Sequence, residues 1–91
     1  MPQAEQLLAT PDRTTVNING QDYVVRGEAP EYIQRLAAYV DKRMRQVSQK
    51  FPNYPPVKVA VLAALNIADE LYKAQQDYET LVKLIQEEKR G

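Results

Sequence analysis

The sequence contains no cysteine, no histidine and no tryptophan, and only three of its 91 residues are glycine. Without cysteine, the chain has neither a disulfide framework nor a thiolate zinc site. Without cysteine or histidine, it also lacks the side chains that most often act as nucleophile or base at neutral pH. The three glycines form neither a phosphate-binding loop nor a dinucleotide fingerprint. We therefore expect a protein that is not an enzyme and that binds no cofactor and no metal ion.

An excess of one charge and a long apolar run are also missing. Twelve basic residues balance twelve acidic ones, which argues against a general electrostatic affinity for nucleic acid or anionic lipid. No stretch approaches the ~18 to 20 apolar residues of a membrane span, and the N-terminus lacks the charged and apolar regions of a signal peptide. We expect one small cytoplasmic domain with no nucleic-acid, membrane or small-molecule partner.

The first part of the chain changes character at Thr14. Residues 1–13 show no sustained hydrophobic period and contain two prolines, so we expect a flexible N-terminal arm. From Thr14 polar and apolar residues alternate around Asn19-Gly20, a strong hairpin signal because both residues tolerate a positive φ. One face of this hairpin is apolar and needs cover from the helices that follow. The expected register pairs Thr14 with Val25, Val16 with Tyr23 and Ile18 with Gln21.

A first helix is predicted from Pro30. The fixed φ of proline suits the first helical turn, where its missing N–H would be unpaired anyway. Apolar residues then recur at spacings of three and four, which predicts about five turns with one apolar stripe that lies across the hairpin. Pro52, Pro55 and Pro56 end this helix and separate it from the next one. The residues of the stripe are Ile33, Leu36, Ala37, Val40, Met44 and Val47.

A second and longer helix is predicted from Pro56 to Lys89, and its apolar seam alternates spacings of four and three as in a coiled coil. At about 1.5 Å per residue this helix is roughly 50 Å long, more than the ~30 Å diameter of a small domain. One chain cannot cover its far half, so we expect a homo-oligomer with the seam as its interface. The seam residues are Ala60, Ala64, Ile67, Leu71, Ala74, Tyr78, Leu81 and Ile85.

These elements together predict an α+β fold with an N-terminal β-hairpin, one medium helix and a long C-terminal helix that forms an intersubunit coiled coil. The flexible arm covers residues 1–13, a globular head covers residues 14–72, and a coiled-coil arm covers residues 73–91. The sequence does not determine whether the helices pair parallel or antiparallel. It also does not determine whether the assembly is a dimer or larger.

The charged residues suggest a surface rather than a catalytic site. Asp69 and Glu70 are consecutive on the second helix, so their side chains point about 100° apart and are interpreted as solvated charges. Cations gather near the end of the first helix, beside Phe51 and Tyr54. This cluster is interpreted as a solvated helix end, a contact for an acidic protein surface, or a surface that tracks phosphates and stacks bases. Its members are Lys42, Arg43, Arg45 and Lys50, which Arg26 and Lys58 could extend.

Three segments closely resemble the ZapA family of bacterial cell-division proteins: residues 23–27 (YVVRG), 36–44 (LAAYVDKRM) and 59–71 (VAVLAALNIADEL). The likeness runs from about Thr14 to Lys83, and its most specific part is AALNIADEL at 63–71. The resemblance implies a cytoplasmic protein at the mid-cell division site that binds FtsZ, the tubulin-like GTPase of the division ring. It also implies that the protein cross-links or bundles FtsZ filaments as a dimer or a dimer of dimers, built through the heads and the long helices.

Some members of that family carry basic residues after the hairpin glycine, whereas Gly20 is followed here by Gln21 and Asp22. We therefore expect the filament contact on the positive surface of the head instead. Two other functions remain open, a coiled-coil dimerisation adaptor for another cytoplasmic assembly and a small nucleic-acid-binding dimer. The candidate filament-binding residues are Arg26, Lys42, Arg43, Arg45 and Lys58.

Overall fold

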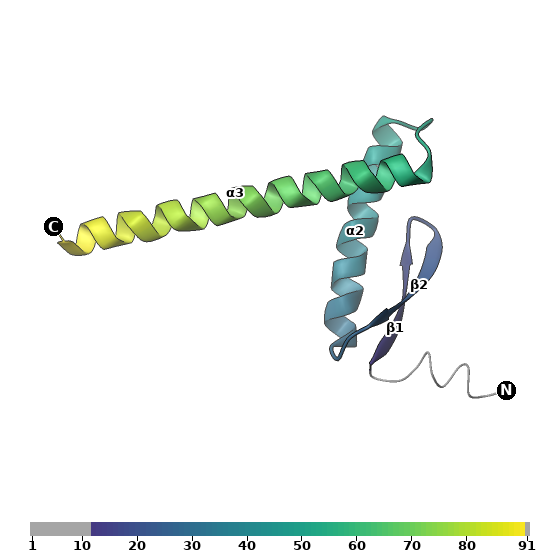
Figure 1. The fold of residues 1–91 in the computed structure, drawn as a ribbon, viewed down its shortest axis with the longest axis horizontal. Coiled ribbons are helices and arrows are strands. Elements are labelled where there is room, and N and C mark those ends of the chain that lie inside the picture. Colours follow the sequence, from purple (N-terminus) through teal and green to yellow (C-terminus); the bar gives the residue numbers. More distant parts are fainter. Residues whose placement is uncertain (1–11, 91) are drawn as a thin grey trace.

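The structure is a computed structural model that describes residues 12–90, with side chains up to residue 88. Its elements are strand β1 (Arg13–Ile18), strand β2 (Gln21–Arg26), helix α2 (Pro30–Lys50) and helix α3 (Pro56–Arg90). The hairpin lies beside α2, and α3 crosses α2 near its C-terminal end and continues far beyond it (Figure 1). The predicted hairpin, medium helix and long helix are therefore confirmed. The flexible arm predicted for residues 1–13 lies outside the described residues except for residue 12 and Arg13, which begins β1.

The hairpin has the predicted register, with Thr14 opposite Val25 and Val16 opposite Tyr23. Its turn places Asn19 at φ 53° and Gly20 at φ 84°, the left-handed values that a two-residue turn of this type requires. The backbone N–H of Asn19 donates a hydrogen bond of 2.7 Å to Asp41 Oδ1. The tip of the hairpin is thereby attached to the middle of α2.

The junction between the helices is a stiff turn. Helix α2 ends where the N–H of Phe51 donates to the carbonyl of Val47 at 2.8 Å. The rings of Phe51 and Tyr54 then stack with their centroids 4.6 Å apart, and the prolines around them restrict the backbone. Because the turn is short, the start of α3 is held against the end of α2.

The core of the chain consists of two small clusters. One joins β1 to the first half of α2, and the other joins the second half of α2 to the first turns of α3, with Ile18 packed against both. The members of the first cluster are Val16, Ile33 and Ala37, and those of the second are Met44, Val47, Val59 and Ala63.

The cover expected for the hairpin is present along β1 only. Val16 is buried beneath α2, whereas its partner Tyr23 on the same face is 47% exposed and Val25 is 37% exposed. Every residue of β2 is exposed, because α2 packs along β1. The apolar face of the hairpin is therefore half open.

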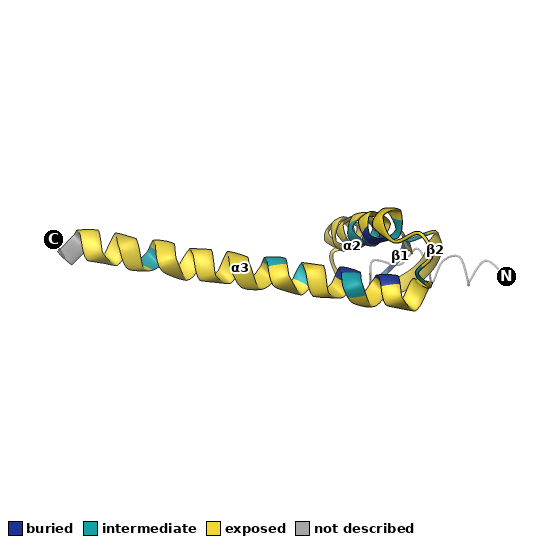
Figure 2. Ribbon diagram, turned by 90° about the horizontal axis from the view of Figure 1, so that it is seen from above, coloured by how far each residue is buried: buried dark blue, intermediate teal, exposed yellow. Residues whose placement is uncertain are grey.

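We call β1, β2, α2 and residues 56–72 the head, and residues 73–90 the arm. The chain measures 68 × 37 × 14 Å and has a radius of gyration of 18.8 Å, against about 12 Å for a compact domain of this length. Figure 2 shows that the buried residues are confined to the head, while the arm is exposed almost throughout. Over its described side chains, α3 buries only Val59 and Ala63.

Candidate interaction surfaces

The described residues offer surfaces rather than an enclosed site. No group of three or more potential metal-ligating side chains occurs among them. None of the described helices combines the length and the apolar character needed to cross a membrane. The features that could bind something are therefore the uncovered apolar strips on the helices and hairpin, and the cations of the head.

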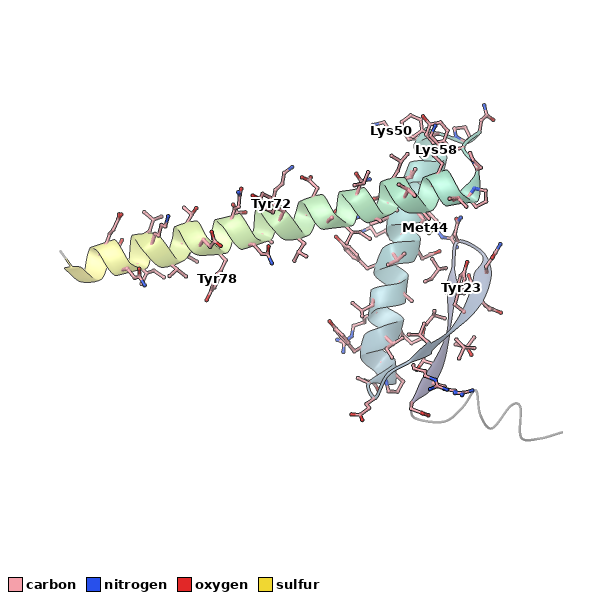
Figure 3. All side chains as sticks on the ribbon, viewed as in Figure 1. Tyr23, Met44, Lys50, Lys58, Tyr72 and Tyr78 are labelled. Carbon is pink, nitrogen blue, oxygen red and sulfur yellow. The ribbon has the colours of Figure 1, made fainter. Side chains whose placement is uncertain are left out.

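The predicted seam is uncovered by the chain itself. Ile67 is half-buried, and the other seven members are exposed; Tyr78, for example, is 68% exposed and projects from the arm (Figure 3). A helix with an apolar stripe along one face needs a second surface to bury it. The seam as an oligomer interface stays a prediction, and the geometry leaves it free for a partner.

A second apolar strip lies on another face of α3. Its members recur at spacings of four and three, and helical geometry places them about 100° around the axis from the seam and away from α2. Sequence reasoning did not separate this strip from the seam, although ten consecutive uncharged residues, 59–68, were the available signal. The strip consists of Val57, Val61, Leu65, Ala68 and Tyr72, all exposed.

The open half of the hairpin adds a third apolar surface. An almost wholly apolar hollow of about 180 Å³ lies between the hairpin and α2, lined by residues that include Val25, Ile33 and Leu36. Leu36 is half exposed. The head therefore has two uncovered apolar surfaces, the second strip and this hollow, in addition to the seam.

The five cations predicted to bind filaments do not form one patch. Lys42 and Arg45 are exposed one helical turn apart on α2. Arg26 ends β2 close to the start of α2, whereas Lys58 lies in the first turn of α3, at the opposite end of α2, with its Nζ 4.1 Å from the centre of the Tyr54 ring. The structure thus brings Lys42 and Arg45 together and leaves Arg26 and Lys58 apart.

Arg45 is partly neutralised by its own helix. Its Nε donates to Asp41 Oδ2 at 2.8 Å. The hydrogen bond from the Asn19 backbone, aided by Arg45, holds the pKa of Asp41 below its ordinary value. Asp41 is therefore an anchor for the hairpin tip and a local counter-charge for Arg45.

Arg43, the fifth candidate, is turned toward α3 and forms an ion pair with Glu70. The hydroxyl of Tyr39 also donates to Glu70, and Arg43 Nη1 donates to Gln46 Oε1 at 2.7 Å. The expectation that Glu70 is a solvated charge is wrong, because the crossing of the helices brings it to α2. Its neighbour Asp69 does face solvent, where it pairs with Lys73 at 3.0 Å.

A further cation stands at the corner between the helices. Lys50, which was not among the five candidates, lies with Lys58 at the end of the molecule where α2 gives way to α3 (Figure 3). Between Asp41 and Asp69 the sequence contains five cations and no acidic residue. This part of the head therefore carries a local positive excess, although the whole chain is neutral.

Comparison with known proteins agrees with this architecture. Residues 14–90 match the family model described as cell division protein ZapA. The cell division protein ZapA of Geobacillus kaustophilus is 42% identical over 80 residues, which cover 87% of this chain and 88% of that protein. The protein from Shouchella clausii with the same description is 44% identical over 68 residues, 74% of this chain and 87% of the relative.

Two solved structures have similar folds. A ZapA mutant dimer from Geobacillus stearothermophilus is 38% identical with a TM-score of 0.65, over 85% of this chain and 91% of the other. A protein from Pseudomonas aeruginosa PAO1, described as an unknown conserved bacterial protein, is 25% identical with a TM-score of 0.73, over 87% and 89% of the two chains.

Proposed function

Because this chain belongs to the ZapA family of cell division proteins, we propose that it binds FtsZ filaments and cross-links or bundles them at the division ring. It acts in the cytoplasm at mid-cell as a symmetric homo-oligomer. The function is mechanical, and no reaction is assigned to it. The observation that supports it best is the set of apolar strips that the chain presents and does not cover.

Self-association is proposed through two separate contacts. The seam of the arm faces a second arm, while the second strip and the open hairpin face a second head. The solved relative from Geobacillus stearothermophilus is described as a dimer. Because the two contacts lie on different faces of α3, one chain could use both at once, which allows a dimer of dimers.

Cross-linking follows from the separation of head and arm. The arm adds about 27 Å of helix beyond the head at 1.5 Å per residue, so paired arms hold heads apart. When two heads of one oligomer attach to filaments, the second attachment is effectively intramolecular and strengthens the first without any new contact. A weak head contact is therefore sufficient for stable bundles.

The filament contact is proposed on the exposed cations of the head, which do not form one continuous patch. Of the five original candidates, Lys42, Arg26 and Lys58 have no ion pair among the described residues. Arg45 is exposed but shares its charge with Asp41, and Arg43 is engaged with Glu70. An acidic filament surface is the complementary partner, and such a contact should weaken as salt rises.

The proposal is tested by pelleting the protein with FtsZ polymerised in GTP. Wild type should sediment with the filaments and bundle them. Leu81→Glu places a charge in the seam, so it should separate the arms, abolish bundling and leave weak sedimentation. Gln76→Glu, which adds the same charge on the opposite face of the arm, is the matched control and should bundle as wild type does.

A second experiment tests the filament surface. Lys42→Glu combined with Lys58→Glu should abolish sedimentation while light scattering still reports the oligomer, whereas Lys83→Glu on the arm should change neither. Retained sedimentation of the double variant would reject this surface. Absence of sedimentation in wild type would favour the adaptor function, and a salt-dependent shift of a labelled duplex would favour nucleic-acid binding.

A further inference from the structure

The apolar contact between α2 and α3 is confined to the first turns of α3. Val40, Tyr54 and Leu62 pack against it and are partly buried. Its buried residues are Val59 and Ala63 on α3 and Met44 and Val47 on α2, and Met44 marks the crossing in Figure 3. All four buried residues lie close to one crossing point. An apolar contact near one crossing point resists rotation about that point less than a second, separate attachment does, because dispersion and hydrophobic attraction have no preferred direction.

A second attachment lies farther along α3, where Glu70 meets α2. Its carboxylate accepts a hydrogen bond from the Tyr39 hydroxyl and forms an ion pair with the Arg43 guanidinium. Arg43 Nη2 also donates to the Tyr39 hydroxyl oxygen at 3.1 Å, and its guanidinium carbon lies 5.1 Å from the centre of that ring. We call Tyr39, Arg43 and Glu70 the clasp.

The clasp has a defined geometry, because Arg43 is held in place on several sides. Arg43 has a side chain that is only 26% exposed, and its Nε is buried with no partner among the described residues. Gln46 holds the guanidinium from the other side at 2.7 Å. Charge-assisted hydrogen bonds of this kind impose a geometry, and removal of Glu70 would leave a half-buried cation unpaired.

The apolar crossing and the clasp hold α3 at two separate points, and together they fix the direction of its axis relative to α2. Glu70 follows Ala63 by seven residues, which is about 10 Å along the helix axis. Ile85 lies a further fifteen residues on, about 22 Å beyond the clasp. A small rotation permitted at the crossing is therefore magnified more than twofold at the end of the arm.

We propose that Glu70 is a positioning residue, which through Tyr39 and Arg43 sets the direction in which the arm leaves the head. Resting on the cross-linking function proposed above, the clasp also sets the spacing between bundled filaments. In this proposal the head surface binds the filament and the seam binds the second arm, while the clasp contacts neither of them directly. The clasp fixes the orientation of the arm relative to the head.

Asp69 supplies a matched control. Glu70→Gln and Asp69→Asn each remove one carboxylate charge from adjacent positions of the same helix. Among the described residues Asp69 pairs only with Lys73, on the exposed side, with side chains 60% and 71% exposed, so its loss should leave the arm direction unchanged. Tyr39→Phe keeps every charge and removes only the hydroxyl, which donates to Glu70 and accepts from Arg43, so it tests the clasp even if Glu70→Gln folds poorly.

The direction of the arm is measured by the distance between two spin labels in one chain. The natural sequence has no cysteine, so Glu31→Cys on α2 and Glu79→Cys on the arm introduce the only labelling sites, both exposed. Dilution with unlabelled chain isolates the distance within a protomer. The wild-type background and the Asp69→Asn background should show one narrow distribution.

In the Glu70→Gln background the distribution should broaden and its mean should shift, and Tyr39→Phe should give a smaller change of the same kind. Distributions in both variants that match Asp69→Asn would overturn the proposal. Electron tomography of FtsZ bundles provides the second readout, with irregular filament spacing expected for Glu70→Gln and regular spacing for Asp69→Asn. If wild type forms no bundles, the cross-linking function fails, while the spin-label distances still decide on the clasp.

Discussion

The head and the arm share one continuous helix, α3, which buries apolar side chains in the head and leaves those of its seam exposed in the arm. In the head, Val59 and Ala63 of α3 are each 1% exposed because α2 lies over them, whereas Leu81 and Ile85 of the arm are 55% and 45% exposed. Helix formation depends on local propensity and hydrogen bonds, but burial requires a second surface. The comparison indicates that the chain forms the whole of α3 by itself but supplies a covering surface only for the part of α3 that lies in the head.

The largest effect is expected from a variant that creates a cavity in the core of the head. Met44→Ala should lower the free energy of unfolding by about 2 to 5 kcal/mol, since it removes a buried side chain at the helix crossing. We expect this loss at every protein concentration, because the contacts lie within one chain. Urea unfolding at two widely separated concentrations measures it, and a loss that disappears on dilution would contradict the distinction between head and arm.

The matched change in the arm is Leu81→Ala. Its cost should be about 1 to 2 kcal/mol per chain, the value of the apolar area that a partner arm still has to cover. This cost should be seen only where the oligomer forms, so it should vanish in dilute solution. Unfolding followed by circular dichroism over a dilution series checks it, and an effect independent of concentration would place the partner of Leu81 within its own chain.

The hairpin turn offers a smaller effect restricted to the head. Gly20 has φ 84° and no atom that an added Cβ would meet within 4 Å, so only backbone strain opposes a side chain there. Gly20→Ala should destabilise the fold by about 1 to 2 kcal/mol. Thermal unfolding measures this cost, and Gln21→Ala in ordinary strand conformation is the control. Equal losses in the two variants would reject a role for the left-handed turn.

The smallest effect concerns pH and the anchor of the hairpin tip. The folded state lowers the pKa of Asp41 through the Asn19 N–H and Arg45, so its stabilising contribution is complete above the pKa that this carboxyl has in the unfolded chain. It is lost as pH falls through the lower folded-state pKa. The stability difference between wild type and Asp41→Asn should therefore shrink as the pH is lowered from 5 toward 2. A difference that stays constant over this range would contradict the anchor.

Much of the fold could be predicted because its signals are local. The Asn19-Gly20 turn determined the strand register, and the alternation on either side of it determined which face is apolar. Pro30 and Pro56 marked the starts of both helices. In each case the physical cause lies within a few residues of its effect, so one sequence was enough.

The arrangement of charges was predicted less well. Arg43 and Glu70 were assigned separately, one to a filament surface and the other to solvent, because 27 positions separate them in the sequence. They meet only because α3 crosses α2 close to its C-terminal end. Arg26 and Lys58 were grouped with Lys42 as one positive area, and the same packing places them at opposite ends of α2.

The sequence by itself determined the elements, the apolar seam and the need for a second copy, because periodicity and turn chemistry act over short distances and hydrophobic area can be counted along a helix. Only the tertiary structure decided which faces the chain covers for itself. It left β2 and the second strip open, and it paired Glu70 with Tyr39 and Arg43. Those outcomes depend on the angle and position at which two helices cross, and no local pattern in the chain specifies either.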